Sequence, residues 1–429
     1  MLNPLSLLKA RALSVVFAAL LACQAVQVKA EVYPAMRSED ARATIGINTH
    51  VNYLDTTYAD FPAVLRALDY VGVDHIRELT PMPWLSGAAP LGYYDQLMRA
   101  GLNIDFVVPG GKVDLVKSIL PVIDLAKGRP GKISAIEGFN EVDHAPVTFG
   151  GETGPGAAVA AQKQLFSIVR SHEVLKDIPV YDLTGVMPLP TSLAGRADYG
   201  NAHLYPQNGY PPDGWFRGMK DLASASKLPM VVTEFGYASM PERGWLVVGV
   251  DEAGQAKGIL SGIFSGIENG FARTYLYQLF DEKPDPNNAD REWHFGLYDV
   301  QYRKKISAVA LHNLTTLLAD ARPDARSFVT QPLDLKLSGL PEKAHIVVLQ
   351  KADRRYLVAL WSEQVFWDHV EKTPKATKVT PVRVTLPAGV TSARLYDPLL
   401  SEAPTDAVMD KGELVIPVPD HPVLLELMP

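Results

Sequence analysis

Short β-rich runs alternate with helical runs along the chain from about residue 43 onward. In the helical run 58–71, apolar residues recur three and four positions apart, and Gly72 follows the last of them. Further runs of this kind cover 93–100, 157–175 and 251–269. Alternation of this type is typical of βα units that build a parallel sheet. The predicted strands are 44–50, 75–79, 103–109, 133–141, 179–186, 199–205, 229–235 and 273–280.

This number of strands predicts the architecture of the larger part of the chain. Eight strands separated by helices over about 280 residues match a (β/α)8 barrel, which typically needs about 250 residues. A doubly wound open sheet is the structural alternative. It is disfavoured because no glycine-rich phosphate loop follows the first strand, where a dinucleotide-binding fold would carry one.

The pattern changes after about residue 328, where helical periodicity gives way to short alternating runs. Proline and Asp/Gly turns separate these runs. Such a pattern predicts an antiparallel β-sandwich of roughly 100 residues. We therefore expect a signal peptide over 1–30, a barrel domain over 31–327 and a sandwich domain over 328–429.

The first thirty residues resemble a targeting segment. Lys9 and Arg11 form a basic start, an apolar stretch covers 13–22, and small residues end the segment at Ala30. The apolar stretch is about half of the roughly 20 residues that a bilayer-spanning helix needs, so we expect no transmembrane helix. The chain is expected to be secreted or periplasmic. The residues around Cys23, the only cysteine, also resemble a lipoprotein box, which leaves a lipid anchor as an alternative.

Composition narrows the function classes. Apolar residues make up 47% and charged residues 21%, which is the balance of a globular protein. The formal net charge is −7, a poor composition for binding phosphate backbones, so nucleic acid is not an expected partner. The absence of cysteine after residue 30 excludes disulfides and thiol chemistry there. No paired histidine spacing suggests zinc, and no cofactor is expected.

Two glutamates directly follow apolar strands. In a (β/α)8 barrel the reacting groups lie at the carboxyl ends of the strands, and Glu141 and Glu234 close the fourth and the seventh. Either residue alone is equally well explained by a structural salt bridge. Two facing carboxylates, however, are what glycosidic cleavage needs, because one protonates the leaving oxygen and the other attacks the anomeric carbon. Glu137, deeper on the fourth strand, is the weaker candidate for the acid.

The motifs around these glutamates resemble a known group. Gly138-Phe139-Asn140-Glu141 and Thr233-Glu234-Phe235-Gly236 are similar to the two signatures of clan A glycoside hydrolases. The barrel followed by a small β-domain is similar to family-39-like bacterial exopolysaccharide hydrolases. The resemblance implies that Glu141 is the acid/base and Glu234 the nucleophile.

The same resemblance assigns supporting roles at other strand ends. Arg77 would support the nucleophile, Asn140 would bind a sugar hydroxyl, and His203 and Tyr205 match a His-x-Tyr motif. Tyr277 stands where the clan often has tryptophan. His50 is expected in the wall of the site. Aromatic residues that could stack on sugars are Tyr53, Trp84, Trp215, Tyr237, Tyr277 and Trp293.

These residues together predict a retaining glycoside hydrolase that cleaves a β-linked poly- or oligosaccharide. Glu141 is then expected to sit in a dry setting that keeps it protonated until it donates. Transglycosylation on the same scaffold is an alternative, because a sugar can capture the same covalent intermediate. A non-catalytic carbohydrate-binding protein is a second alternative from a different class.

Overall fold

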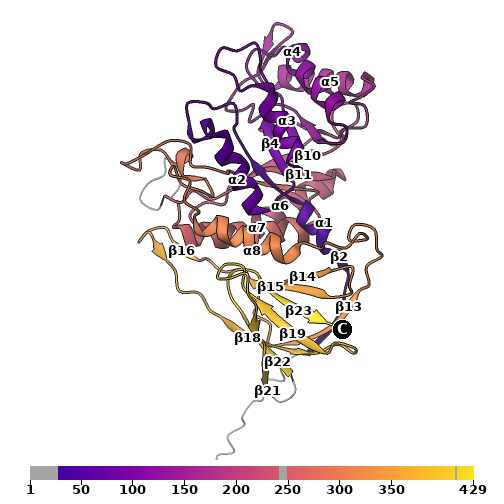
Figure 1. Cartoon of the computed structure of the whole chain (residues 1–429), viewed down its shortest axis with the longest axis vertical. Helices are drawn as coiled ribbons and strands as arrows, with labels where there is room; N and C mark the ends of the chain where they lie inside the picture. The colour runs from indigo at the N-terminus through magenta and orange to yellow at the C-terminus, as the bar shows by residue number, and fades with distance from the viewer. Residues whose placement is uncertain (1–27, 241–248, 411–412) are drawn as a thin grey trace, which may run out of the picture.

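The computed structural model describes residues 28–240, 249–410 and 413–429. The predicted signal peptide up to residue 27, and with it Cys23, lies outside the described residues. Figure 1 shows an upper α/β unit and a lower β unit, which are in direct contact. Among the described residues, no helix combines the length and the apolar character that crossing a membrane requires.

The α/β unit is the predicted (β/α)8 barrel. Its eight parallel strands pair in the order β10-β11-β12-β3-β4-β5-β6-β9, and a parallel bridge between Tyr181 and Tyr199 links the two ends. Apolar residues of the strands and helices form one large buried core. The strands are β3 (Ile45–Asn48), β4 (His75–Leu79), β5 (Asn103–Val107), β6 (Ile133–Glu137), β9 (Val180–Tyr181), β10 (Gly200–Leu204), β11 (Met230–Phe235) and β12 (Thr274–Leu276).

Helices cover the outside of the barrel with one exception. Asp60 caps α2 by accepting a hydrogen bond from the Ala63 amide, and Gly72 ends that helix in the left-handed conformation. No helix joins β9 to β10, since the described residues 182–198 form turns, bends and irregular backbone. The helices are α1 (Ser38–Ala43), α2 (Phe61–Val71), α3 (Leu91–Arg99), α4 (Leu115–Gly128), α5 (Pro155–Ser171), α6 (Asp213–Ser226), α7 (Glu252–Glu268) and α8 (Ile306–Leu318).

The β unit is a sandwich of two mainly antiparallel sheets. One sheet has the order β1-β13-β18-β22-β21 and the other β2-β14-β15-β23-β19-β20. Alternate side chains of β13 are buried, as expected for a strand with one face on a core. The later strands are β13 (Leu333–Ser338), β14 (Ala344–Gln350), β15 (Tyr356–Ser362), β18 (Thr380–Thr385), β19 (Ser392–Tyr396), β20 (Thr405–Asp406), β21 (Val408–Asp410), β22 (Glu413–Val418) and β23 (Val423–Met428).

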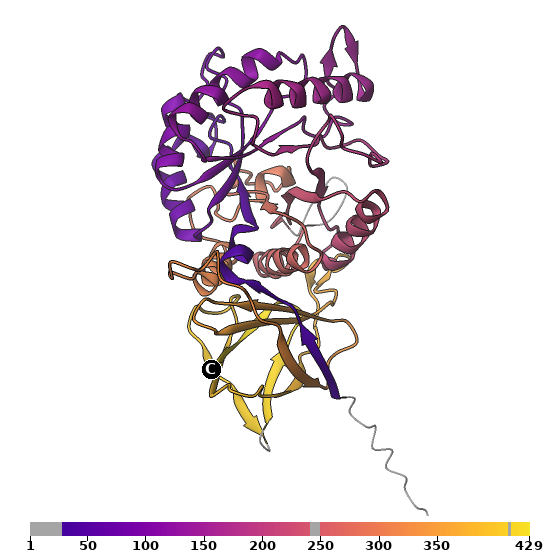
Figure 2. The same ribbon diagram turned by 90° about the vertical axis from the view of Figure 1, so that its right-hand side faces the viewer.

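Two N-terminal strands also belong to the sandwich, which changes the expected domain boundaries. β1 (Val28–Tyr33) pairs with β13, and β2 (Ala35–Arg37) pairs with β14. Figure 2 shows this indigo segment running along the sandwich before the chain enters the barrel. Residues 31–37 were expected in the barrel domain. Their partners lie some 300 residues further along, beyond the reach of local sequence patterns. The predicted cleavage point after Ala30 falls within β1.

Three helices of the barrel, α1, α7 and α8, lie against the sandwich (Figure 1). Trp361 of β15 is fully buried there and packs 5.9 Å from Phe264 of α7, measured between ring centroids. The sandwich is therefore joined to the barrel by a shared apolar core.

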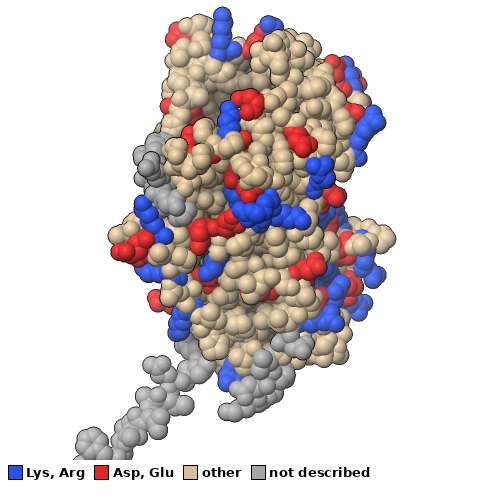
Figure 3. All heavy atoms as spheres, turned by 60° about the vertical axis from the view of Figure 1, so that its left-hand side comes forward, with Lys and Arg blue, Asp and Glu red and all other residues tan. Residues whose placement is uncertain are grey.

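Acidic and basic side chains are interspersed over the face shown in Figure 3, and neither sign forms a continuous stripe on it.

Candidate active site

The predicted site residues converge at the carboxyl ends of the barrel strands. Asn48 and Arg77 are register partners on β3 and β4, and His203 and Glu234 are register partners on β10 and β11. Asn140 and Glu141 directly follow β6. Because parallel strands bring their carboxyl ends to the same mouth, these five strands contribute to one site.

Arg77 is the centre of a buried hydrogen-bond network. Its guanidinium donates through Nε and Nη2 to both oxygens of Glu137, at 2.7 and 2.8 Å. Nη1 donates to Glu234 Oε1 at 2.7 Å and to Asn48 Oδ1 at 2.9 Å. Nη2 also donates to Asn140 Oδ1 at 2.8 Å. An arginine stays charged in proteins, so this fork places a permanent cation against Glu234 Oε1.

Glu137 is fully buried and serves this network. Its side chain has 0% exposure and is held by Arg77 and by the Thr233 hydroxyl, which donates at 3.1 Å. Such a carboxylate cannot reach a substrate at the barrel mouth. The structure therefore gives Glu137 the role of a core partner for Arg77.

The second oxygen of Glu234 has its own donor. The hydroxyl of Tyr205 donates to Oε2 at 2.6 Å. Burial and the nearby charge of Glu234 raise the pKa of Tyr205 well above its usual range, so the phenol keeps its proton and remains a donor. With only 9% of its side chain exposed, Glu234 is oriented at both oxygens before any ligand arrives.

Glu141 lies opposite and is more open, with 32% of its side chain exposed. Its φ of 39° is in the left-handed region, which is strained for a side chain of this type. The turn is held because its amide donates to Thr184 Oγ1 at 2.9 Å, a contact with the chain after β9. One oxygen of Glu141, one of Glu234 and a ring nitrogen of His203 all lie within 4.8 Å of one another.

The electrostatic setting of Glu141 differs from the expectation. His203 Nδ1 lies 2.8 Å from its Oε1, and this hydrogen bond lowers the pKa of Glu141 to about 2, against the opposing effect of partial burial. His144, 3.4 Å from Oε2, acts in the same direction. The prediction that Glu141 is kept protonated was therefore wrong for the free protein. Local sequence could not reveal that His203 of β10, 62 positions along the chain, faces it.

The glycines of both motifs are explained by close packing. A Cβ on Gly138 would lie 1.8 Å from Gln162 Oε1, and one on Gly236 would lie 2.5 Å from the Tyr277 carbonyl oxygen. Neither glycine has a positive φ, so close approach and not backbone strain requires it. Gly236 in particular allows the chain after β12 to bring Tyr277 beside Glu234.

Tyr277 and His50 form an aromatic wall of the site. His50 stacks on Tyr53 with ring centroids 4.7 Å apart and meets Tyr277 edge-on at 5.7 Å. Tyr277 also contacts the ring of Tyr205 edge-on at 6.0 Å. Burial and the charge of Arg77 lower the pKa of His50 to about 3. His50 is thus a neutral wall residue at physiological pH.

Other candidate aromatics lie elsewhere. Trp84 is 42% exposed and lines a separate cavity with Lys112 and Phe149, which contains neither candidate glutamate. Tyr237 is buried and its hydroxyl donates to the Tyr210 carbonyl. Trp215 lines a cavity that begins at Glu141.

Two partners in this network were missed at the sequence level. Asn48 accepts from Arg77 and donates through Nδ2 to the Thr233 carbonyl at 3.0 Å. Its place at the end of a barrel strand was the available signal, since polar residues there face the mouth. Thr184 carried no signal of its own, because its role depends on the turn at Glu141.

Glu141, His203 and Glu234 are close enough to hold a cation. Each carboxylate already has charge-assisted or hydroxyl donors from protein, namely Arg77 and Tyr205 on Glu234 and His203 on Glu141. The donors present satisfy the negative charges without an ion. The arrangement suits one ionised carboxylate and one carboxylate that exchanges a proton.

No protein-family model and no curated sequence matches the chain. Among solved structures, it is similar to a family 39 glycoside hydrolase of the gut symbiont Bacteroides cellulosilyticus WH2, with a TM-score of 0.61 at 15% identity over 92% of this chain and 83% of that one. It is also similar to the GH39 enzyme from Xanthomonas axonopodis pv. citri, with a TM-score of 0.55 at 15% identity over 92% and 96% of the two chains. The chain therefore has the barrel-plus-sandwich fold of these family 39 glycoside hydrolases, as its motifs predicted.

Proposed function

We propose that this protein is a retaining glycoside hydrolase acting on a β-linked poly- or oligosaccharide by double displacement. The observation that carries the proposal is that one carboxylate oxygen of Glu141 and one of Glu234 lie within 4.8 Å of each other at the barrel mouth. Carboxyl groups about 5 Å apart suit retention, whereas inverting enzymes need about 6.5–9.5 Å to admit a water between them. The fold shared with family 39 enzymes supports the same reaction class.

In the first step, a carboxylate oxygen of Glu234 attacks the anomeric carbon while the bond to the leaving oxygen breaks. Glu141 gives its proton to that oxygen. Arg77 and Tyr205 orient the attacking carboxylate through their hydrogen bonds to its two oxygens. In the second step, Glu141 takes a proton from water, whose oxygen attacks the anomeric carbon and releases Glu234.

Glu141 must gain a proton before it can act as the acid. In the free protein its pKa is about 2, so it is ionised near neutral pH. We infer that substrate raises this pKa, because a sugar over a side chain that is 32% exposed removes its water. Once Glu234 is esterified its charge is lost, and Glu141 then ionises more readily and serves as the base.

Glu141→Ala is expected to separate substrates by their leaving groups. With a p-nitrophenyl glycoside, whose leaving group needs no protonation, formation of the intermediate should be nearly unchanged. With an alkyl glycoside or an oligosaccharide it should slow by roughly 10²–10⁴-fold. The measurement is pre-steady-state burst and steady-state kinetics on the sugar that a panel of β-glycosides shows to be cleaved. Equal losses on good and poor leaving groups would contradict the acid role.

His203→Ala is expected to shift the pH dependence of kcat, which reports the enzyme–substrate complex, toward alkaline pH. The hydrogen bond from His203 lowers the pKa of Glu141, so its removal raises that pKa. An acid donates only while protonated, and the alkaline limb of the profile then moves to higher pH. His144→Ala is the matched control and should move the limb less in the same direction, because this contact is longer at 3.4 Å. An unmoved limb in His203→Ala would show that His203 does not set the protonation of Glu141.

A further inference from the structure

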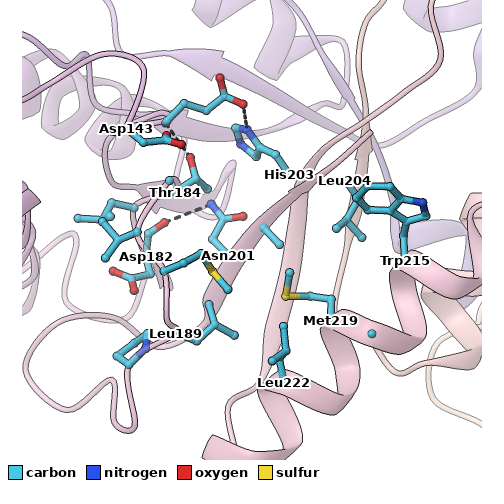
Figure 4. A pocket seen from close by; sticks show the side chains of 18 of the residues that line it. Asp143, Asp182, Thr184, Leu189, Asn201, His203, Leu204, Trp215, Met219 and Leu222 are labelled. Atoms are coloured by element: carbon cyan, nitrogen blue, oxygen red, sulfur yellow. Dashed lines mark hydrogen bonds and ion pairs between the residues drawn. The ribbon is translucent and has the colours of Figure 1, made fainter. Parts of the chain in front are cut away.

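The gap in the ring of helices leaves one flank of the barrel uncovered. In this fold a helix normally follows each strand and covers its outer face. Residues 182–198 form turns, bends and irregular backbone in that place, and α6 begins only at Asp213. The side of α6 that faces the gap therefore has no neighbouring helix. Figure 4 shows the space between this chain segment and α6.

This space is a cavity of about 780 Å³, within the usual range of small-molecule sites. Trp215, Met219 and Leu222 line it at helical spacing, so they form one apolar face of α6. Seven residues of helix extend over about 10 Å, which makes the apolar wall longer than one ring. Leu189 and Leu204 lie among the residues of the opposite wall and floor (Figure 4).

The proposed acid/base, Glu141, lies at one end of this cavity. Glu141 and His203 belong to its lining, whereas Glu234 and Arg77 do not. The sugar that becomes bonded to Glu234 must lie on the Glu234 side of the pair. The group whose oxygen Glu141 protonates must then depart on the other side, where the cavity opens.

Charge at the cavity favours a neutral occupant. Of its acids, Asp182 accepts from Arg196 at 2.7 Å, and Glu363 of the sandwich accepts from Arg217 at 2.9 Å. Asp143 and Glu141 stand at the end near the barrel mouth and would repel an anion. The deeper part offers mainly aliphatic and aromatic surface.

We propose, building on the proposed function, that this cavity is a leaving-group subsite for a linear apolar chain. The substrate class would be a β-glycoside whose leaving group carries an alkyl or acyl chain, laid along Trp215, Met219 and Leu222. The oxygen end of that group lies at Glu141, and its chain extends along the apolar face of α6. Trp215 and Leu222 are 42% and 50% exposed, so each methylene is only about half buried and contributes roughly a twofold gain in affinity, or about 100-fold for seven methylenes.

A binding test does not depend on catalysis. The neutral dye N-phenyl-1-naphthylamine, which fluoresces in apolar sites, is titrated into the full chain. Octyl β-D-glucoside or methyl β-D-glucoside is then added to displace the dye. The octyl glucoside is kept below the concentration at which it forms micelles. Octyl glucoside should displace it at a concentration on the order of 100-fold lower. Leu222→Asp, at a position 50% exposed, should weaken dye binding about tenfold, whereas Leu120→Asp, 53% exposed on α4, should not.

A kinetic test uses alkyl glycosides of the sugar that the enzyme cleaves. Wild type should favour octyl over methyl in kcat/KM by on the order of 100-fold, and Leu222→Asp should remove most of that preference. Equal kcat/KM for both chain lengths, or dye binding unaffected by Leu222→Asp, overturns the subsite. Chain-dependent dye displacement without cleavage of any glycoside supports the apolar-chain site and overturns the proposed hydrolase instead.

Discussion

Glu234→Ala is expected to lower kcat/KM by roughly 10⁴-fold or more on every substrate of the enzyme, including those with good leaving groups. The reason is that neither of the two neighbouring glutamates can replace it as the nucleophile. Glu137 is fully buried beneath Arg77, and Glu141 faces the leaving oxygen. Steady-state kinetics on p-nitrophenyl and alkyl glycosides measures the loss.

Two further variants serve as controls for this result. Glu234→Gln keeps the shape and should be nearly as inactive, which separates loss of the nucleophile from loss of packing. Glu173→Ala removes an exposed glutamate distant from the network and should retain activity. If Glu234→Ala keeps more than a tenth of wild-type kcat/KM with an intact thermal transition, Glu234 is not the nucleophile.

Arg77→Met is expected to destabilise the fold by about 3–5 kcal/mol and to abolish activity. The change removes the guanidinium that pairs with Glu137, whose side chain is 0% exposed, and leaves that carboxylate buried without its cation. It also removes the donor that holds Glu234 Oε1. Denaturant unfolding measures the free energy of unfolding, and kinetics measures activity.

Arg99→Met is the matched control for this substitution. Arg99 pairs with Asp95 one helical turn away and is 65% exposed, so its loss should cost less than about 1 kcal/mol. Adding Glu137→Met to Arg77→Met should recover much of the lost stability, because both buried charges are then gone. It should not recover activity, since Glu234 still lacks its partner. If Arg77→Met alone is as stable as Arg99→Met, the claim that Arg77 stabilises the buried network is contradicted.

The barrel could be predicted because its signals are local. Strand and helix periods, and caps such as Gly72, depend on residues within a few turns of one another. That residues 28–37 belong to the sandwich could not be predicted, because their strands pair with the distant residues 333–338 and 348–350. The missing helix was visible only as the absence of helical periodicity over 182–199, where Pro188 and Pro190 interrupt the chain.

The candidate site could be predicted from the motifs around Glu141 and Glu234 and from the rule that reacting groups lie at the carboxyl ends of barrel strands. Arg77, Asn140, His203 and Tyr205 converge on the glutamates as that rule requires. The protonation of Glu141 could not be inferred, because it depends on the orientation of His203 across the barrel. Trp84 shows the limit of choosing aromatics by position alone, since the turn after β4 carries it into a separate cavity.

The central claim is that Glu234 forms a covalent intermediate on the side of the sugar opposite the leaving group, with Glu141 as acid/base. The anomeric configuration of the first product, followed by ¹H NMR before mutarotation, tests it most directly. From a β-glycoside, wild type should release the β-anomer, and Glu234→Ala supplied with azide should release the α-glycosyl azide. An α-configured first product from wild type would contradict double displacement by this pair.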